Sequence, residues 1–209
     1  MKIKISADST CDLSPELIER YHIGITPLYI IRGETLRDGI DVRPEELYEY
    51  ANATGKLCET AAVNVSDYLA YFAACREEYD AVIHFTISSD MSACYQNACI
   101  AAQEFTNVYP VDSRNLSTGI GHLVLDAAEM AEQGMDAADI ASALEKKREK
   151  LDVSFVIDTL DYLRKGGRCS TVAALGANLL KLKPCIEVHE GKMSVAKKYR
   201  GTLAKAIES

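Results

Sequence analysis

The sequence lacks any run of 18 apolar residues, although 48% of its 209 residues are hydrophobic. A membrane-spanning helix needs about 20 consecutive, predominantly apolar residues, so the sequence predicts no integral membrane segment. The N-terminus, residues 1–6, reads as a strand and not as a signal peptide, because no apolar segment follows its lysines. We therefore expect a cytoplasmic protein with a sizeable core.

Positive charge is also scarce. The 23 lysines and arginines stand against 31 aspartates and glutamates, which gives a net charge of −8 and a pI near 5.1. Such a field repels a polyanion, so we expect no nucleic-acid partner. The most basic stretches, residues 181–183 and 192–200, are diluted by apolar residues. They read mainly as the surface of a strand and a helix, although contact with an anionic partner stays open.

The sequence has neither the pattern of a metal site nor a phosphate-binding loop. Its seven cysteines include no CxxC pair, and its four histidines show no ligand spacing. The GxxxxGKS/T and GxGxxG patterns are both absent. We therefore predict no metal, no cofactor and no disulfide framework, and we interpret His84 and His122 as packed core residues.

Short, continuously apolar segments alternate with segments of helical periodicity along most of the chain. The apolar segments span residues 3–7, 23–31, 81–86, 108–111 and 153–157. Continuously apolar strands are typical of a parallel sheet buried on both faces, and helices are the elements that cover such faces. The sequence therefore predicts an α/β fold with a mostly parallel sheet flanked by helices.

The pattern changes after residue 156. An alanine-rich segment with helical character precedes two apolar strands, 185–189 and 192–198, which Glu190-Gly191 joins as a hairpin. We predict a parallel-sheet domain at residues 1–156 and the start of a smaller α/β domain with antiparallel strands at residues 157–209. About 50 residues form only a marginal core alone, so the second domain is expected to be truncated.

Hydroxyl groups gather where the predicted strands end, and open parallel sheets bind ligands at those carboxyl ends. Ser9 follows the first strand, and Ser88 follows the strand at residues 81–86. Ser92 precedes a predicted helix, so its hydroxyl and the free N–H groups of Ala93 and Cys94 can face one anion together. The alternative is that Ser92 does no more than cap its own helix.

Several stretches of the chain match the motifs of one family, in that family's order. They are ADSTCDL at residues 7–13, RDGID at 37–41, ISSDMS at 87–92 with YQ at 95–96, VDS at 111–113, and DTLDYLRKGGR at 158–168. The chain therefore resembles the DegV family, and the resemblance runs over nearly its whole length. The last of these motifs is long and specific.

Members of that family bind fatty acids, and several are the lipid-presenting subunit of a bacterial fatty acid kinase. The resemblance implies a long-chain fatty acid as the ligand. Its carboxylate is expected at Thr60 and Ser92, and its tail in an apolar tunnel between the two domains. Arg200, together with Arg168, is assigned to the kinase partner or to phosphoryl transfer. No catalytic residue is expected in this chain, because a separate kinase performs the reaction.

Some features depart from the family pattern. Thr60 is followed by Ala61-Ala62-Val63 where the family has Ser, Gln and Pro, and Ser92 is followed by Ala93 where the family has Gly. A histidine of the family's head-group site has no counterpart in these 209 residues. We therefore expect an altered head-group site and an acyl tunnel that is open on one side.

Two other functions stay open. In the first, the chain is a lipid-sensing or structural lipid-binding module without a kinase partner. In the second, it is a stand-alone hydrolase or transferase, which requires a nucleophile such as Cys11 or an acid–base pair such as Asp8 and Asp12. No base is recognisable beside Cys11 in the sequence.

Overall fold

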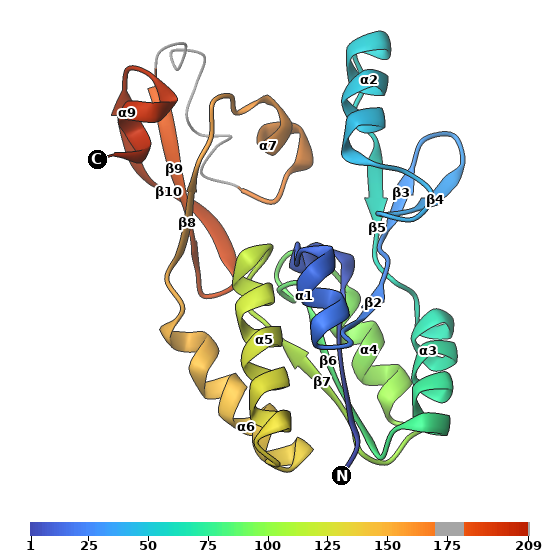
Figure 1. The fold of residues 1–209 in the computed structure, drawn as a ribbon. Coiled ribbons are helices and arrows are strands. Elements are labelled where there is room, and N and C mark those ends of the chain that lie inside the picture. Colours follow the sequence, from blue (N-terminus) through green and yellow to red (C-terminus); the bar gives the residue numbers. More distant parts are fainter. Residues whose placement is uncertain (170–181, 209) are drawn as a thin grey trace. The chain divides into compact units, whose positions relative to one another are not determined.

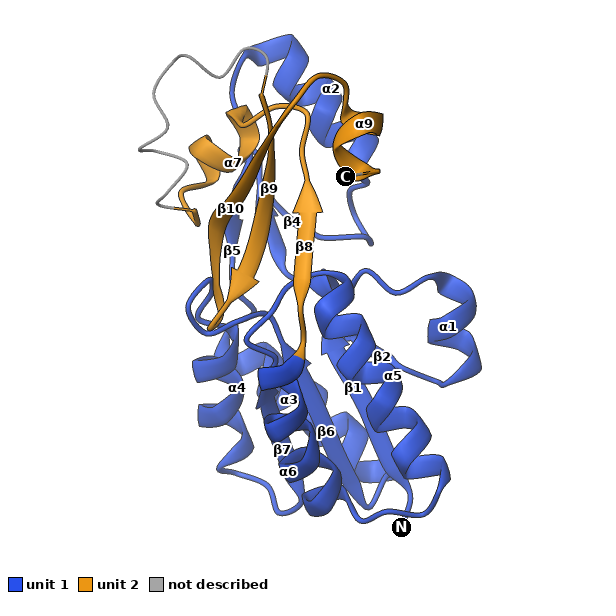
Figure 2. Ribbon diagram, turned by 90° about the vertical axis from the view of Figure 1, so that its left-hand side faces the viewer, with its two compact units in different colours: residues 1–150 blue, residues 151–209 orange. Residues whose placement is uncertain are grey.

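The computed structural model describes residues 1–169 and 182–208, and the chain divides into two compact units, Met1–Lys150 and Leu151–Ser209 (Figure 2). The predicted boundary at residue 156 falls later than this division. The reason is that strand β8 (Val153–Val156) pairs with β9 (Leu182–His189), so β8 belongs to the second unit. The predicted alanine-rich helix lies outside the described residues.

The first unit is built on a four-stranded parallel sheet, called sheet A, with the strand order β2-β1-β6-β7. Its strands are β1 (Ile3–Asp8), β2 (Gly24–Thr26), β6 (Ala81–Thr86) and β7 (Val108–Asp112). All residues of β6 are buried, as expected for a central strand that is covered on both faces. The prediction of an α/β fold with a mostly parallel sheet is confirmed.

Helices flank sheet A (Figure 1), with α3 packed beside α4 and α5 packed beside α6. The helices are α1 (Pro15–Arg20), α3 (Val65–Glu78), α4 (Cys94–Ala102), α5 (Thr118–Glu132) and α6 (Ala137–Lys147), with the 3-10 helices η1 (Ser9–Cys11) and η2 (Arg148–Lys150). Within residues 1–169 and 182–208, no helix is long and apolar enough to cross a membrane.

The two histidines that were interpreted as core residues differ in how deeply they are buried. His84 lies in β6 and is fully buried, with its ring against those of Tyr68, Tyr71 and Phe72, so that prediction is confirmed. The prediction for His122 is wrong, because its side chain is 56% exposed. The buried stripe of α5 contains its neighbours on either side in the sequence, and His122 falls on the opposite face of the helix.

The segment at residues 23–31 is not a single strand. It splits at Pro27 into β2 of sheet A and β3 (Tyr29–Ile31), which belongs to a separate antiparallel sheet, called sheet B. Proline has no N–H group to donate to a strand ladder. Sheet B has the order β4-β3-β5, with β4 (Thr35–Arg37) and β5 (Glu59–Ala61), and α2 (Pro44–Thr54) lies between these two strands in the chain.

The second unit contains an antiparallel sheet with the order β10-β9-β8. β9 and β10 (Lys192–Arg200) form the predicted hairpin, whose turn residues Glu190 and Gly191 both have a positive φ, as a tight two-residue turn requires. Two helices, α7 (Asp161–Gly166) and α9 (Leu203–Ile207), complete the described part of this unit. Gly167 ends α7 with φ at 71°, a left-handed conformation that glycine adopts without strain.

Candidate functional site

Ser92 lies in the loop that joins β6 to α4, at the carboxyl edge of sheet A. The carbonyl oxygen of Ser88 accepts the N–H groups of Met91 at 2.9 Å and of Ser92 at 3.1 Å, so the loop is a tight turn. The Ser92 hydroxyl donates to the Cys94 thiol at 3.2 Å and accepts the Cys94 N–H at 3.4 Å. The second distance is long for a hydrogen bond, and a thiol is a weak acceptor, so the helix uses this hydroxyl only weakly.

Ala93 is the residue immediately before α4, and its side chain is exposed. Its φ is −79° and its ψ is 1°, a conformation that alanine adopts without strain. The backbone at this position therefore does not require the glycine that the family pattern has. The added methyl group points to the surface of the loop and leaves the N–H groups at the start of α4 in place.

Thr60 lies in β5 of sheet B, where it pairs with Ile30 of β3, and it is exposed. The chain leads from Thr60 directly to Val63, which touches the first turns of α4. The Asn97 side-chain amide donates to the Val63 carbonyl oxygen at 2.8 Å. One hydrogen bond thus ties the segment that follows Thr60 to the helix that begins beside Ser92.

Ser9 holds the connection between the two sheets of the first unit. Its hydroxyl donates to the Asp38 carboxylate at 2.7 Å and accepts the Leu28 N–H at 3.1 Å. Leu28 follows the break at Pro27, so Ser9 takes the place of a strand partner for this N–H group. The hydroxyl of Ser9 is therefore committed to the protein itself in this structure.

Asp8 ends β1 and is fully buried. Its carboxylate accepts the N–H of Ile87 at 2.7 Å, the N–H of Thr10 at 3.2 Å, and the Thr10 hydroxyl. Burial raises the pKa of Asp8 to about 6, and the nearby Asp38 adds to the rise, although the hydrogen bonds from Thr10 and Ile87 oppose it. Asp8 thus anchors the beginning of the loop that carries Ser92.

Ser88 is also fully buried. Its N–H donates to the Asn115 carbonyl oxygen at 2.9 Å, and its hydroxyl accepts the Asp90 N–H at 3.3 Å. These contacts lie within the loop and with the neighbouring loop. Among the predicted ligand-binding serines, Ser88 therefore supports the backbone of the loop, and Ser92 is the more accessible of the two.

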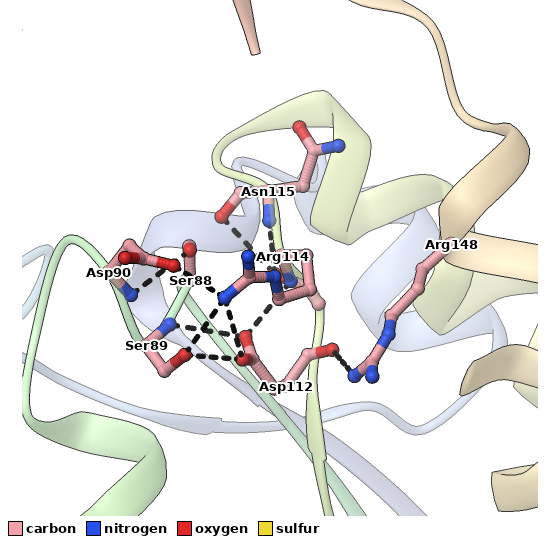
Figure 3. Close-up of polar contacts among 8 residues, drawn as sticks. Ser88, Ser89, Asp90, Asp112, Arg114, Asn115 and Arg148 are labelled. Atoms are coloured by element: carbon pink, nitrogen blue, oxygen red, sulfur yellow. Dashed lines mark hydrogen bonds and ion pairs between the residues drawn. The ribbon is translucent and has the colours of Figure 1, made fainter. Parts of the chain in front are cut away.

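A polar cluster whose contacts the sequence does not reveal lies beside this loop (Figure 3). The Asp112 carboxylate at the end of β7 accepts the Ser89 hydroxyl at 2.6 Å, the Ser89 N–H at 3.1 Å and the Arg114 N–H at 2.9 Å. The Arg114 guanidinium is 2.5 Å from the Asp90 carboxylate, and Arg148 donates to the Asp112 carbonyl oxygen at 2.5 Å. Charged residues that follow two strands were the available signal, but the sequence does not show that β6 and β7 are neighbours.

The two arginines assigned to a partner lie in the second unit. Arg168 is exposed after the end of α7, and its guanidinium donates to the Gly166 carbonyl oxygen at 2.6 Å. Arg200 is exposed at the end of β10, where it pairs with Leu182 of β9. Both side chains are thus available at the surface of this unit.

The chemistry of a cysteine nucleophile finds no support. Cys11 is 2% exposed, and burial raises the pKa of its thiol, with the nearby Asp8 and Asp12 adding to the rise. An activated cysteine needs the opposite, a lowered pKa and access to the substrate. Among the described residues, no group of three or more His, Cys, Asp and Glu side chains is arranged to hold a metal ion.

The fold and these loops define an α/β protein whose polar groups converge at the carboxyl edge of a parallel sheet, the usual location of a ligand site in this architecture. The chain belongs to the DegV family, whose model ("Uncharacterised protein, DegV family") matches residues 2–209. A DegV domain-containing protein of Clostridium perfringens is 36% identical over 204 residues, which are 96% of this chain and 73% of that protein.

Solved structures show the same relationship. A structure described as fatty acid binding of a DegV family protein from Thermus thermophilus is 33% identical and superposes with a TM-score of 0.91, over 100% of this chain and 75% of that one. A stearic acid-binding protein from Eubacterium ventriosum is 28% identical with a TM-score of 0.85, over 96% of this chain and 71% of that one.

Proposed function

We propose that this protein binds a long-chain fatty acid, with the carboxylate at Ser92 and Thr60 and the acyl chain in an apolar tunnel. The observation that carries the proposal is the position of the Ser92 hydroxyl. It lies where α4 begins at the carboxyl edge of sheet A, and both of its bonds to Cys94 of that helix are weak: the thiol is a poor acceptor, and the N–H is 3.4 Å away. The structures of fatty-acid-binding relatives with the same fold support the choice of ligand.

The charges at this position favour an anion. The start of a helix presents free N–H groups and the positive end of the helix dipole, and a carboxylate is stabilised there. The Ser92 hydroxyl can turn its single proton from the Cys94 thiol, which is a weak acceptor, to that carboxylate. The acyl chain supplies most of the affinity, because each buried methylene contributes about 0.8 kcal/mol.

Presentation of the bound acid to a separate kinase is the second part of the proposal. Its support is the distribution of charge along the chain: residues 151–209 contain ten lysines and arginines against six acidic residues, whereas residues 1–150 contain 13 against 25. A basic unit on an acidic protein favours docking to an acidic surface and speeds the encounter. The alternative is a lipid-sensing or structural lipid-binding module without a kinase.

The decisive experiment for fatty-acid binding is native mass spectrometry, followed by denaturing extraction of the ligand. We expect about one fatty acid per wild-type chain and a large loss in a Ser92→Ala, Thr60→Val double variant. Hydrogen bonds to a charged group contribute roughly 1.5–3 kcal/mol each, so the loss of one or two weakens binding at least about tenfold.

The matched control keeps the chemistry of the substitutions and changes their place. Ser66 in α3 and Thr35 in β4 are also exposed, so the Ser66→Ala, Thr35→Val double variant removes the same atoms away from the proposed site. It should load fatty acid as the wild type does. A wild-type protein that is purified without bound fatty acid and takes up no added fatty acid would contradict the proposal.

The kinase interaction has its own prediction. Reversal of charge in an Arg168→Glu, Arg200→Glu variant is expected to abolish co-purification with a kinase subunit of the same organism and to leave fatty-acid loading intact. The wild-type interaction should weaken as the salt concentration rises, because exposed charges are screened within about 10 Å at 0.1 M salt. A wild-type protein that captures no kinase at low salt would favour the lipid-sensing module instead.

A further inference from the structure

The place of the Ser92 hydroxyl depends on the loop of residues 87–93 as a whole. The loop turns at Ser88, whose carbonyl oxygen accepts the N–H groups of both Met91 and Ser92. This turn sets the direction in which the chain enters α4. Any movement of residues 88–90 therefore carries Ser92 with it.

The neighbouring loop, residues 112–117 after β7, holds that turn from the side (Figure 3). Asp112 binds both the N–H and the hydroxyl of Ser89, Arg114 contacts the carboxylate of Asp90, and Asn115 accepts the N–H of Ser88. Three successive residues of the Ser92 loop are thus bound by one short segment of the adjacent loop. We call Asp90, Asp112 and Arg114 the loop clamp.

The loop clamp is held together by charge. Arg114 lies 2.5 Å from a carboxylate oxygen of Asp90 and 4.0 Å from one of Asp112, and the Asp112 side chain is only 7% exposed. Without the guanidinium, the carboxylates of Asp90 and Asp112 would lose the cation that lies within 4.0 Å of both. Like charges that are no longer bridged by a cation repel, so the loop would be held less firmly.

The polar atoms of this cluster are engaged with each other, so the cluster is not itself a site for a ligand. We propose instead that Arg114 and Asp112 are positioning residues for the carboxylate site: by fixing residues 88–90 they hold the Ser92 hydroxyl where it meets the head group of the acid. This inference rests on the proposed fatty-acid binding. It goes beyond that proposal by naming residues that never touch the ligand yet determine how well its carboxylate is recognised.

The experiment separates recognition of the head group from binding of the tail. The affinities of cis-vaccenic acid and of the alcohol with the same chain are measured by displacement of a fluorescent fatty acid. In the wild type the acid should bind more tightly than the alcohol. In Arg114→Gln the affinity for the acid should fall about tenfold, because the displaced Ser92 hydroxyl loses its bond to the carboxylate. The affinity for the alcohol should hardly change.

A double-mutant cycle then tests whether the loop clamp acts through Ser92. In a Ser92→Ala background, Arg114→Gln should cause much less further loss, because coupled residues are not additive. Arg114→Lys should recover part of the acid affinity. The control is Glu78→Gln, which removes the Lys2–Glu78 ion pair of the same unit and should leave both affinities unchanged.

The failures of the two proposals are distinguishable. A wild-type protein that binds neither probe overturns the fatty-acid proposal, and the inference falls with it. Normal binding combined with an equal loss from Arg114→Gln in both backgrounds, or an equal loss for acid and alcohol, overturns the positioning role alone. If Arg114→Gln does not fold, Ser89→Ala carries the same cycle, because it removes the hydroxyl bond from Ser89 to Asp112 and leaves the ion pair between Arg114 and Asp90 in place.

Discussion

The Gly121→Ala variant is expected to be less stable than the wild type by about 1–3 kcal/mol, the usual cost of overpacking a close contact. Gly121 lies in the buried part of α5. A β-carbon at this position would be 2.8 Å from the backbone oxygen of Cys11 and 3.0 Å from a methyl carbon of Leu13. The side chain of Leu13 can move, but the carbonyl of Cys11 belongs to the backbone of η1 and cannot yield without moving that segment.

The sign of this effect is not obvious, because alanine in the interior of a helix is favoured over glycine by about 0.5–1 kcal/mol. The contact outweighs that preference here. The matched control is Gly166→Ala in α7, where an added β-carbon meets no atom of residues 1–169 and 182–208 within 4 Å. The midpoint of chemical denaturation should fall below that of the wild type in Gly121→Ala. In Gly166→Ala it should be unchanged or higher. An unchanged midpoint for Gly121→Ala would show that η1 adapts freely.

The second large effect is on the pH dependence of stability. Burial lowers the pKa of His84 to about 3. The ring is fully buried, Nδ1 is 2.9 Å from the Ser6 hydroxyl, and Nε2 has no hydrogen-bond partner among the described residues. The native state therefore keeps His84 neutral. The contribution of His84 to the free energy of unfolding is fully present above pH 6.5, the ordinary pKa of histidine. It is lost as the pH falls toward 3, by roughly 1.4 kcal/mol per pH unit.

Asp8 acts in the opposite direction. Its pKa is raised from 3.8 to about 6, so the native state binds its proton more readily than the unfolded chain does. Its contribution to stability is fully present below about pH 4 and is lost as the pH rises through 6, a total of about 3 kcal/mol. Between pH 6 and 4 the two groups largely cancel, and His84 alone lowers stability below pH 4.

Single substitutions should uncover the two slopes. In Asp8→Asn, stability relative to the wild type should fall between pH 6 and 4, because the effect of His84 is no longer opposed. Position 84 is surrounded by aromatic rings, so phenylalanine is a suitable replacement there. In His84→Phe, stability relative to the wild type should rise as the pH falls from 6 to 4. Urea midpoints at pH 6.5, 5 and 4 measure both. Parallel pH profiles for the two variants would contradict this assignment.

Much of the architecture was predictable from the pattern of apolar residues. Strands that are continuously apolar, such as β6, indicated a parallel sheet covered on both faces, and the turn residues Glu190-Gly191 indicated the hairpin. The split at Pro27 was missed, because an apolar run does not reveal that its two halves belong to different sheets. His122 was misplaced for a related reason: the mean hydropathy of a helix does not tell which face a single residue occupies.

The candidate site was predictable only in part. The position of Ser92 at a helix start follows from local sequence, since strand ends and helix starts have recognisable signals. The burial of Ser88 and the role of Ser9 as a link between sheets depend on contacts with Asn115 and Asp38, which are distant in the chain. The loop clamp depends on the neighbouring positions of β6 and β7, which only the strand order reveals.

The Ser9 hydroxyl lies where the chain crosses from sheet A to sheet B, and this crossing affects the distance between the two hydroxyls of the proposed site. In the proposed site, Ser92 follows a strand of sheet A, whereas Thr60 is carried by sheet B, and the chain passes between the sheets where Ser9 receives the N–H of Leu28. The distance between the two hydroxyls therefore depends on this crossing as well as on the bond from Asn97 to Val63. Substitutions at Pro27 or Ser9 would change the spacing of the two hydroxyls without altering either of them.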